Sequence, residues 1–235
     1  MNDSQRPWRN FYGRRRGKAL RPGQRMHLET TLATLTLPRV NWEDNPDRVP
    51  LALDKIFPDC TDLWLEIGFG GGEHLLHVSQ SNDTTGIIGC EPFINGVAMV
   101  LPHLAQRGAT RVRLHPGDAR DLLDVVPDAA FGRVYLLYPD PWPKKKHHRR
   151  RFVNAENLAA LARVMRPGSE LRIATDIPDY VRHCLEEVMQ STAFDWHAEG
   201  PADWRAPWAD WPGTRYERKA LREGRAPHYL RFVRR

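Results

Sequence analysis

The chain has 235 residues, 41% hydrophobic and 27% charged, a composition typical of a globular protein with one large α/β domain. No apolar run approaches the length that spans a bilayer, and no apolar segment follows the Arg-rich start, so we expect neither a membrane anchor nor a secretory signal. Cys60, Cys90 and Cys184 lack metal or redox spacing, and the histidines show no ligand spacing. We therefore expect a cytoplasmic protein with reduced thiols and no metal.

The net charge of +6 is concentrated at one end of the chain. Residues 1–25 hold eight Lys or Arg against Asp3 alone, whereas the rest carries 27 basic and 28 acidic residues. A basic segment on a near-neutral body favours nucleic-acid binding, because phosphate contacts release condensed counterions. Trp8, Phe11 and Tyr12 are interleaved with the arginines, which favours stacking or docking. We predict a flexible basic arm at 1–25 and a single domain at 26–235.

Strands and helices alternate through the predicted domain. A short helix within 22–36 and a helical turn at 54–57 precede strands at 63–67, 86–91, 111–115, 134–138 and 170–176, with candidate strands at 194–199 and 228–233. Helical spacing fits 74–78, 93–107, 154–165 and 178–190. This alternation is typical of βαβ units. We therefore predict a Rossmann-like α/β fold, with a mostly parallel seven-stranded sheet and helices on both faces.

An acidic residue stands at the end of each of the five central strands. Ligands of such sheets bind beyond the carboxyl ends of the strands, so these acids should share one edge. Together they suit a ligand that carries hydrogen-bond donors and positive charge. The five are Glu66, Glu91, Asp118, Asp140 and Asp176.

The first strand ends in a glycine-rich loop, 66–72, that reads E-x-G-x-G-x-G. A dinucleotide fingerprint would need glycine at 73, where Glu73 stands and would compete with a pyrophosphate for the helix dipole. S-adenosylmethionine (SAM), a cationic nucleoside without phosphate, fits better, and Gly68 and Gly70 become candidate cofactor contacts. Glu66 suits its amino-acid end, Glu91 its ribose hydroxyls and Asp118 its adenine amine.

A proline-bracketed loop, 138–143, follows the fourth strand and presents Asp140 and Trp142. Trp142 either stacks on a flipped base or packs the loop against the core. Six of the next eight residues are Lys or Arg, and we expect them to hold phosphates of folded RNA. The expected RNA contacts are Lys145, Lys146, His147, Arg149, Arg150 and Arg151.

These motifs together resemble the bacterial tRNA (guanine-N7-)-methyltransferases. The resemblance extends from the arm to residue 232 and rests on 66–72, Glu91, 117–119, 138–147, 174–176 and 214–217. It implies methylation of the variable-loop guanosine at tRNA position 46, by a monomer or weak homo-oligomer. It implies SAM binding by Glu66, Glu91, Asp118 and Asp140, with Asp140 as the catalytic residue. It also implies target binding by Lys144, Asp176, Thr214, Arg215, Tyr216 and Glu217.

Guanine N7 is a bare lone pair and has no proton to lose. We therefore expect Asp140 to position the purine and stabilise developing positive charge, and not to act as a base. The acceptors of Thr214 and Glu217 suit the Watson–Crick edge of guanine. Two other functions stay open. The Asp140-Pro141-Trp142 element is similar to the loop of enzymes that methylate exocyclic amines, and a non-catalytic RNA-binding protein is the third reading.

Overall fold

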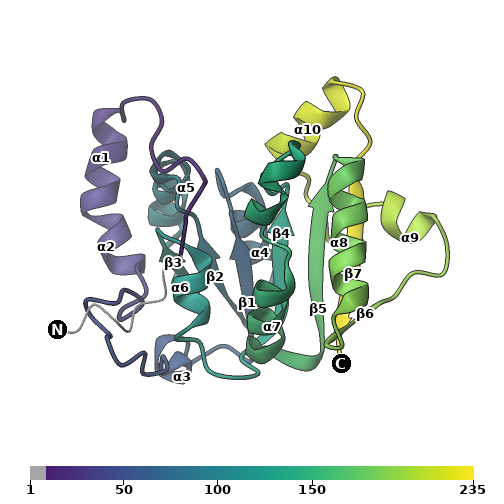
Figure 1. Cartoon of the computed structure of the whole chain (residues 1–235). Helices are drawn as coiled ribbons and strands as arrows, with labels where there is room; N and C mark the ends of the chain where they lie inside the picture. Colours follow the sequence, from purple (N-terminus) through teal and green to yellow (C-terminus); the bar gives the residue numbers. More distant parts are fainter. Residues whose placement is uncertain (1–8) are drawn as a thin grey trace.

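A computed structural model describes residues 9–235, so Arg6 and Trp8 of the predicted arm lie outside the described residues. The central layer is a seven-stranded sheet ordered β3-β2-β1-β4-β5-β7-β6 (Figure 1). Strands β1 to β5 pair in parallel, and β7 runs antiparallel to both β5 and β6. The predicted fold class is therefore confirmed. The strands are β1 (Asp62–Ile67), β2 (Thr85–Cys90), β3 (Val112–His115), β4 (Phe131–Leu137), β5 (Met165–Thr175), β6 (Phe194–Trp196) and β7 (His228–Arg234).

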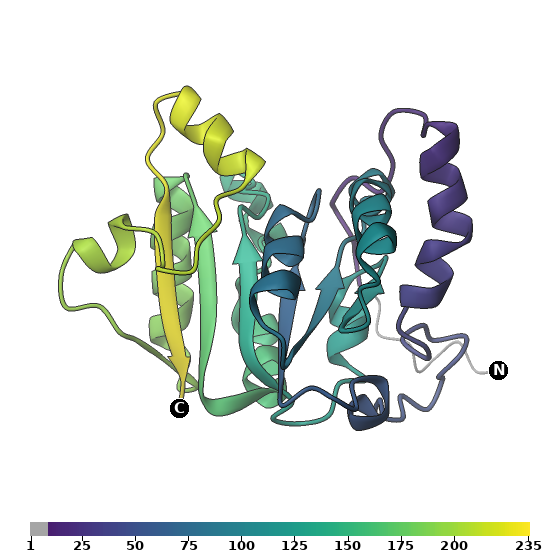
Figure 2. The ribbon, with the colours of Figure 1, turned by 180° about the vertical axis from the view of Figure 1, so that it is seen from behind.

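Helices cover both faces of the sheet. Helices α6, α7 and α8 lie in front in Figure 1, and α4 and α5 lie on the opposite face, seen from behind in Figure 2. The helices are α1 (Pro22–Glu29), α2 (Thr31–Leu35), α3 (Leu53–Ile56), α4 (Glu73–Ser81), α5 (Ile94–Arg107), α6 (Ala119–Leu123), α7 (Ala155–Val164), α8 (Pro178–Gln190), α9 (Ala202–Arg205) and α10 (Arg215–Arg222), with a 3₁₀ helix η2 (Lys145–Arg150).

The two faces bury two separate hydrophobic clusters, because side chains alternate along each strand. On β4, Val134 and Leu136 enter the cluster under α6, α7 and α8, whereas Tyr135 and Leu137 enter the one under α4 and α5. Burial on both faces explains why the central strands are continuous apolar runs without polar alternation.

The helix boundaries follow local sequence signals. Helix α8 starts at Pro178, as predicted, since proline suits the first turn of a helix. The side chain of Asn154 accepts the Asn157 N–H at 2.9 Å and caps α7. The short helices α6, α9 and α10 were not predicted. Strand β5 begins at Met165, five residues earlier than expected.

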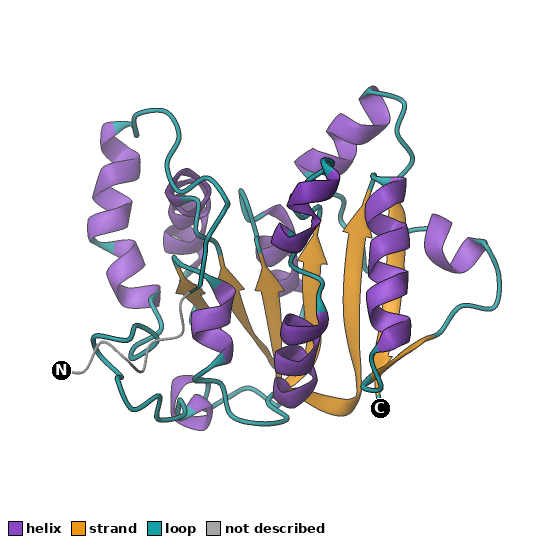
Figure 3. Cartoon of the chain, viewed as in Figure 1, coloured by secondary structure: helices purple, strands orange, loops and turns teal. Residues whose placement is uncertain are grey.

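The carboxyl ends of β1, β2, β3, β4 and β5 meet at one edge of the sheet, at the top of the ribbon in Figure 3. Because β7 is antiparallel to β5, its first residue, His228, pairs with Thr175 at that same edge. Helix α10 directly precedes β7 and therefore lies over the edge. Within residues 9–235, no helix is long and apolar enough to cross a membrane.

Candidate active site

A cavity of about 470 Å³ opens at the carboxyl edge of the sheet. The glycine loop, the ends of β2, β3 and β4, the 10–14 segment and α10 all contribute to its wall. Of the residues predicted from sequence, the wall includes Gly68, Gly70, Glu91, Asp118, Asp140, Arg149, Arg150, Arg151 and Tyr216. Glu66, Lys144, Asp176, Thr214, Arg215 and Glu217 are not part of it.

Glu91, at the end of β2, holds the glycine loop of β1. Its buried carboxylate accepts the Gly70 N–H at 2.6 Å and the Phe93 N–H at 2.8 Å. Gly70 has φ 56° at this point, a left-handed conformation that glycine adopts without strain. Burial raises the pKa of the Glu91 carboxyl, and the two backbone N–H groups act in the opposite direction. Each oxygen keeps a lone pair for a ligand hydroxyl.

Glu66 lies behind the loop and not in the cavity wall. It is 1% exposed, and the Nδ1 of the equally buried His74 lies in hydrogen-bond contact 2.8 Å from its carboxylate. The His74 ring packs against the edge of Tyr135, with centroids 4.3 Å apart. One carboxylate oxygen of Glu66 is therefore engaged by His74, and the contact of Glu66 with SAM stays a prediction.

Asp118, at the end of β3, lines the cavity and caps α6. Its carboxylate accepts the Arg120 backbone N–H at 3.0 Å and the Arg120 guanidinium at 3.0 Å. Burial raises the pKa of Asp118, but the hydrogen bonds from Arg120 outweigh it and hold the pKa below its ordinary value. Asp118 therefore remains a carboxylate, although part of its acceptor capacity is already used by Arg120.

The loop after β4 carries Asp140 between two strained residues. Tyr138 has φ 51° and Trp142 has φ 44°, both in the left-handed region that bulky residues rarely adopt. Such strain costs about 1–3 kcal/mol per residue and clusters at functional sites. Asp140 is exposed at the cavity wall, and no hydrogen bond to its carboxylate is found within residues 9–235. The carboxylate is free to meet a ligand.

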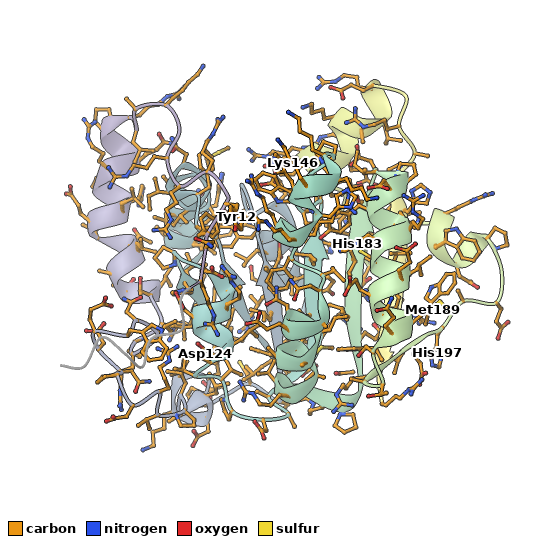
Figure 4. The ribbon with its side chains drawn as sticks, in the orientation of Figure 1. Tyr12, Asp124, Lys146, His183, Met189 and His197 are labelled. Carbon is orange, nitrogen blue, oxygen red and sulfur yellow. The ribbon has the colours of Figure 1, made fainter. Side chains whose placement is uncertain are left out.

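Trp142 contacts the basic run and the N-terminal arm. The Arg150 guanidinium lies 4.9 Å from the Trp142 ring centroid and 4.5 Å from that of Tyr12, and the two rings meet edge-on at 6.4 Å. Figure 4 shows Tyr12 on the arm side of the edge and Lys146 above η2. The alternative in which Trp142 caps the core is therefore not what the structure shows, and base stacking stays a prediction.

The predicted RNA contacts divide by exposure. Lys144, Lys145, Lys146 and Arg149 are exposed, and His147 and Arg150 are half-buried. Arg151 differs from them, because it is 2% exposed and its guanidinium is engaged by Pro141 and Asp179, and its contact with RNA stays a prediction. Desolvation and the surrounding cations lower the pKa of His147, which favours its neutral form.

The 214–217 element is the start of α10. Thr214 and Glu217 form a capping box, and the Glu217 carboxylate also accepts the Trp211 indole N–H at 2.8 Å and the Tyr229 hydroxyl. Both residues are buried and lie outside the cavity wall, and their acceptors stabilise α10, so recognition of guanine by this pair stays a prediction. Tyr216 alone of the four lines the cavity.

Tyr216 and Arg215 tie α10 to the glycine loop. The Tyr216 ring stacks on Tyr138 at 6.4 Å and 20°. A Cβ on Gly70 would lie 3.2 Å from the Tyr216 ring, so the two are in close contact. Arg215 forms an ion pair with Glu73 at the start of α4. Asp176 is held by Arg225 beyond α10.

Residues 9–18 lie across the cavity. Arg9 forms an ion pair with Asp124 at 2.6 Å, the Arg120 guanidinium donates to the Asn10 carbonyl at 3.0 Å, and the Gly17 N–H donates to the Asn95 amide oxygen at 2.7 Å. The Ile94 N–H also reaches the Arg15 carbonyl, at 3.0 Å. This part of the arm docks on the domain through two elements, α5 and α6 with its C-cap.

The chain that forms this sheet, glycine loop and cavity is similar to known proteins in both sequence and fold. A protein-family model described as "Putative methyltransferase" matches residues 61–230. A tRNA (guanine-N(7)-)-methyltransferase of Ruegeria pomeroyi is 60% identical over 97% of this chain and 96% of its own. This chain belongs to the tRNA (guanine-N(7)-)-methyltransferase family. The Roseobacter denitrificans member is 57% identical over the full length of both chains.

Solved structures show the same fold outside the tRNA (guanine-N(7)-)-methyltransferase family. The 16S rRNA methyltransferase KamB has a TM-score of 0.53 at 14% identity, over 78% of this chain and 93% of its own. An antibiotic-related methyltransferase has a TM-score of 0.52 at 14% identity, over 86% and 99%. At this identity the similarity extends to the fold alone.

The sequence did not predict several residues that line the cavity or hold its acidic residues. Tyr12 was noted as an arm aromatic, but its contact with Arg150 depends on the docked course of the arm. Arg120 and His74 hold predicted acids, and neither spacing nor residue type marked them. A signal for Arg151 was present: the apolar Phe152-Val153 follows it directly, which favours burial.

Proposed function

We propose that this protein is an enzyme that transfers the methyl group of SAM to N7 of a guanosine in tRNA, the variable-loop guanosine at position 46. The observation that carries the proposal is the cavity at the carboxyl edge, whose wall includes Glu91, Asp118 and the exposed Asp140. Its volume of about 470 Å³ lies in the range of small-molecule sites.

The residues present fit SAM. Glu91 has lone pairs for a ribose diol, and Asp118 is an ionised acceptor near the expected position of the adenine. Gly68 and Gly70 place backbone without side chains against the ligand. When bound, SAM supplies a methyl group on a positively charged sulfur. The three carboxylates of the wall attract such a cation. The wall also holds five arginines, Arg14, Arg120, Arg149, Arg150 and Arg151.

Asp140 binds the guanine and stabilises its developing charge, and it does not accept a proton. N7 accepts a methyl group through its lone pair, so no base is required. Positive charge moves onto the purine as the methyl transfers, and a carboxylate held nearby stabilises it. The exposure of Asp140 at the cavity wall suits this role, because its acceptors are available to the purine N–H groups.

Basic side chains flank the cavity on two sides. Lys144, Lys145 and Lys146 are exposed on the β4 side, and Arg14, Arg15 and Arg16 are exposed on the arm side. Phosphates of a folded RNA that spans the cavity would meet both groups. We propose that tRNA binds across them, and that the enzyme acts in the cytoplasm as a monomer or weak homo-oligomer.

Borohydride–aniline cleavage of tRNA after incubation with SAM tests the proposal. Cleavage at one variable-loop guanosine is the expected result, with the Asp140→Asn variant as control. Methylated adenine without cleavage would favour exocyclic-amine methylation, because the Asp140-Pro141-Trp142 loop is similar to the loop of enzymes with that activity. RNA binding without methyl transfer would favour a non-catalytic protein.

A further inference from the structure

Arg151 ends the basic run but does not share its environment. Its side chain is 1% exposed, whereas Arg149, two residues earlier, is exposed. A guanidinium keeps its charge in any protein environment, so burying it is costly unless the charge is paired and hydrogen-bonded. The position therefore calls for a specific role in the interior.

The contacts of Arg151 join two neighbouring strand ends. Its Nε–H donates to the carbonyl of Pro141 at 2.9 Å, inside the loop after β4. Its terminal nitrogen pairs with Asp179, in the first turn of α8 after β5. The guanidinium also lies over the Tyr180 ring, 5.4 Å from the centroid. One planar group thus connects the loop after β4 to the start of α8.

The loop after β4 needs external support. Pro139 and Pro141 have no N–H to donate, and Tyr138 and Trp142 occupy left-handed conformations. Strained backbone persists only where its surroundings hold it. The hydrogen bond from Arg151 acts on the Pro141–Trp142 peptide, one residue beyond Asp140.

We propose that Arg151 and Asp179 are positioning residues for methyl transfer, which fix the Pro141–Trp142 peptide and so aim the carboxylate of the neighbouring Asp140. The inference rests on the proposed function, because it assigns Asp140 a role in that reaction. Arg151 borders the cavity, but its guanidinium is engaged by Pro141 and Asp179 and acts through the loop. Asp179 sets the direction of the guanidinium, and its pKa is held low by the hydrogen bond from Arg151, so it remains charged.

Three substitutions and one matched control separate positioning from a general effect on folding. Arg151→Met removes the guanidinium. Arg151→Lys keeps the charge but loses the planar fork that reaches Pro141 and Asp179 together. Asp179→Asn keeps the shape of the partner and removes its charge. The control is Arg182→Met, because Arg182 pairs with the same Asp179 from a 69% exposed position.

The first measurement is the single-turnover rate of methyl transfer at saturating SAM and tRNA, with SAM affinity measured separately. We expect about tenfold or greater loss of rate in Arg151→Lys and Asp179→Asn, since small misplacement of a reacting group is costly. SAM affinity should change less than twofold, and Arg182→Met should match the wild type. An unchanged rate in folded Arg151→Lys and Asp179→Asn would overturn the proposal.

The second measurement does not depend on activity. Trypsin cleavage within 144–150 should become faster in Arg151→Met and Asp179→Asn under native conditions, while Arg182→Met cleaves like the wild type. Equal cleavage in all variants would overturn the proposal even if rates fell. If the wild type fails to methylate tRNA, the proposed function falls, and this measurement still decides whether Arg151 holds the loop.

Discussion

Glu91 and Gly70 are joined by a 2.6 Å hydrogen bond from the glycine N–H to the carboxylate. The bond links the end of β2 to the loop after β1, so the acid expected to bind the ribose also shapes the loop expected to lie beneath the ligand. A preorganised loop binds its ligand at a smaller conformational cost.

Glu91→Gln should weaken SAM binding about tenfold to hundredfold, because a side-chain amide accepts only one of the two backbone N–H groups and turns a donor toward the other. Isothermal titration calorimetry measures the effect. Glu186→Gln, at a 60% exposed position on α8, serves as the control. Equal SAM affinity in the Glu91 variant would remove this residue from the cofactor site.

Because the pKa of Glu91 is raised, the free energy of unfolding and the affinity for SAM should change with pH in opposite directions. Its contribution to the free energy of unfolding is fully present below the ordinary pKa of 4.5 and is lost as the pH rises through the raised folded-state pKa. SAM affinity should instead increase through that pH window, since the ionised carboxylate is the better acceptor. Titrations from pH 4 to 8 should show both trends in the wild type and neither in Glu91→Gln.

Asp140→Asn should lower the rate of methyl transfer by about a hundredfold, the usual scale for loss of one preorganised electrostatic contact. Asp140→Glu keeps the negative charge and should retain more of the rate than Asp140→Asn, because the mechanism uses the charge and not a proton transfer. Equal rates in Asp140→Asn and the wild type would contradict our mechanism.

Glu217→Gln should destabilise the protein by about 1–3 kcal/mol, because three donors converge on this buried carboxylate. Urea unfolding measures the change, again with Glu186→Gln as control. Loss of RNA methylation in a variant of unchanged stability would instead support the recognition of guanine by Glu217 that the sequence motif suggested.

Deletion of residues 1–20 removes six Lys or Arg residues and the 10–14 part of the cavity wall. The salt dependence of tRNA binding should become shallower, by about 0.7–0.9 in the logarithmic slope for each phosphate that the arm neutralises. SAM affinity should also fall. Tyr12→Ala keeps all the charges and should leave the slope unchanged. Identical slopes for the deletion variant and the wild type would show that the arm neutralises no phosphates of the tRNA.

The sequence was sufficient to predict the alternation of strands and helices, the mostly parallel sheet and the edge of the sheet at which the cavity lies. Periodicity located the five parallel strands, and the rule that ligands bind at their carboxyl ends placed Glu91, Asp118 and Asp140 together. These predictions depend on local pattern and on the topology that follows from it.

The remaining features depend on contacts between distant residues. Arg151 pairs with a residue 28 positions away and Arg9 with one 115 positions away, so neither partner is visible in a local window. A run of basic residues indicates a solvated face, and the position of α8 shows which partner holds the buried member. The partners of Glu217, Trp211 and Tyr229, likewise approach it in the folded chain.

The antiparallel pairing of β7 has a consequence for how the protein is made. Tyr216 reaches Gly70 because α10 is held between the 211–214 segment and β7, whose first residue pairs with Thr175. A growing chain on the ribosome exposes the glycine loop and Asp140 well before β7 has emerged. Until that strand pairs, α10 has no fixed place over the cavity. The part of the cavity wall that α10 supplies therefore forms only after β7 has been synthesised and has paired with β5.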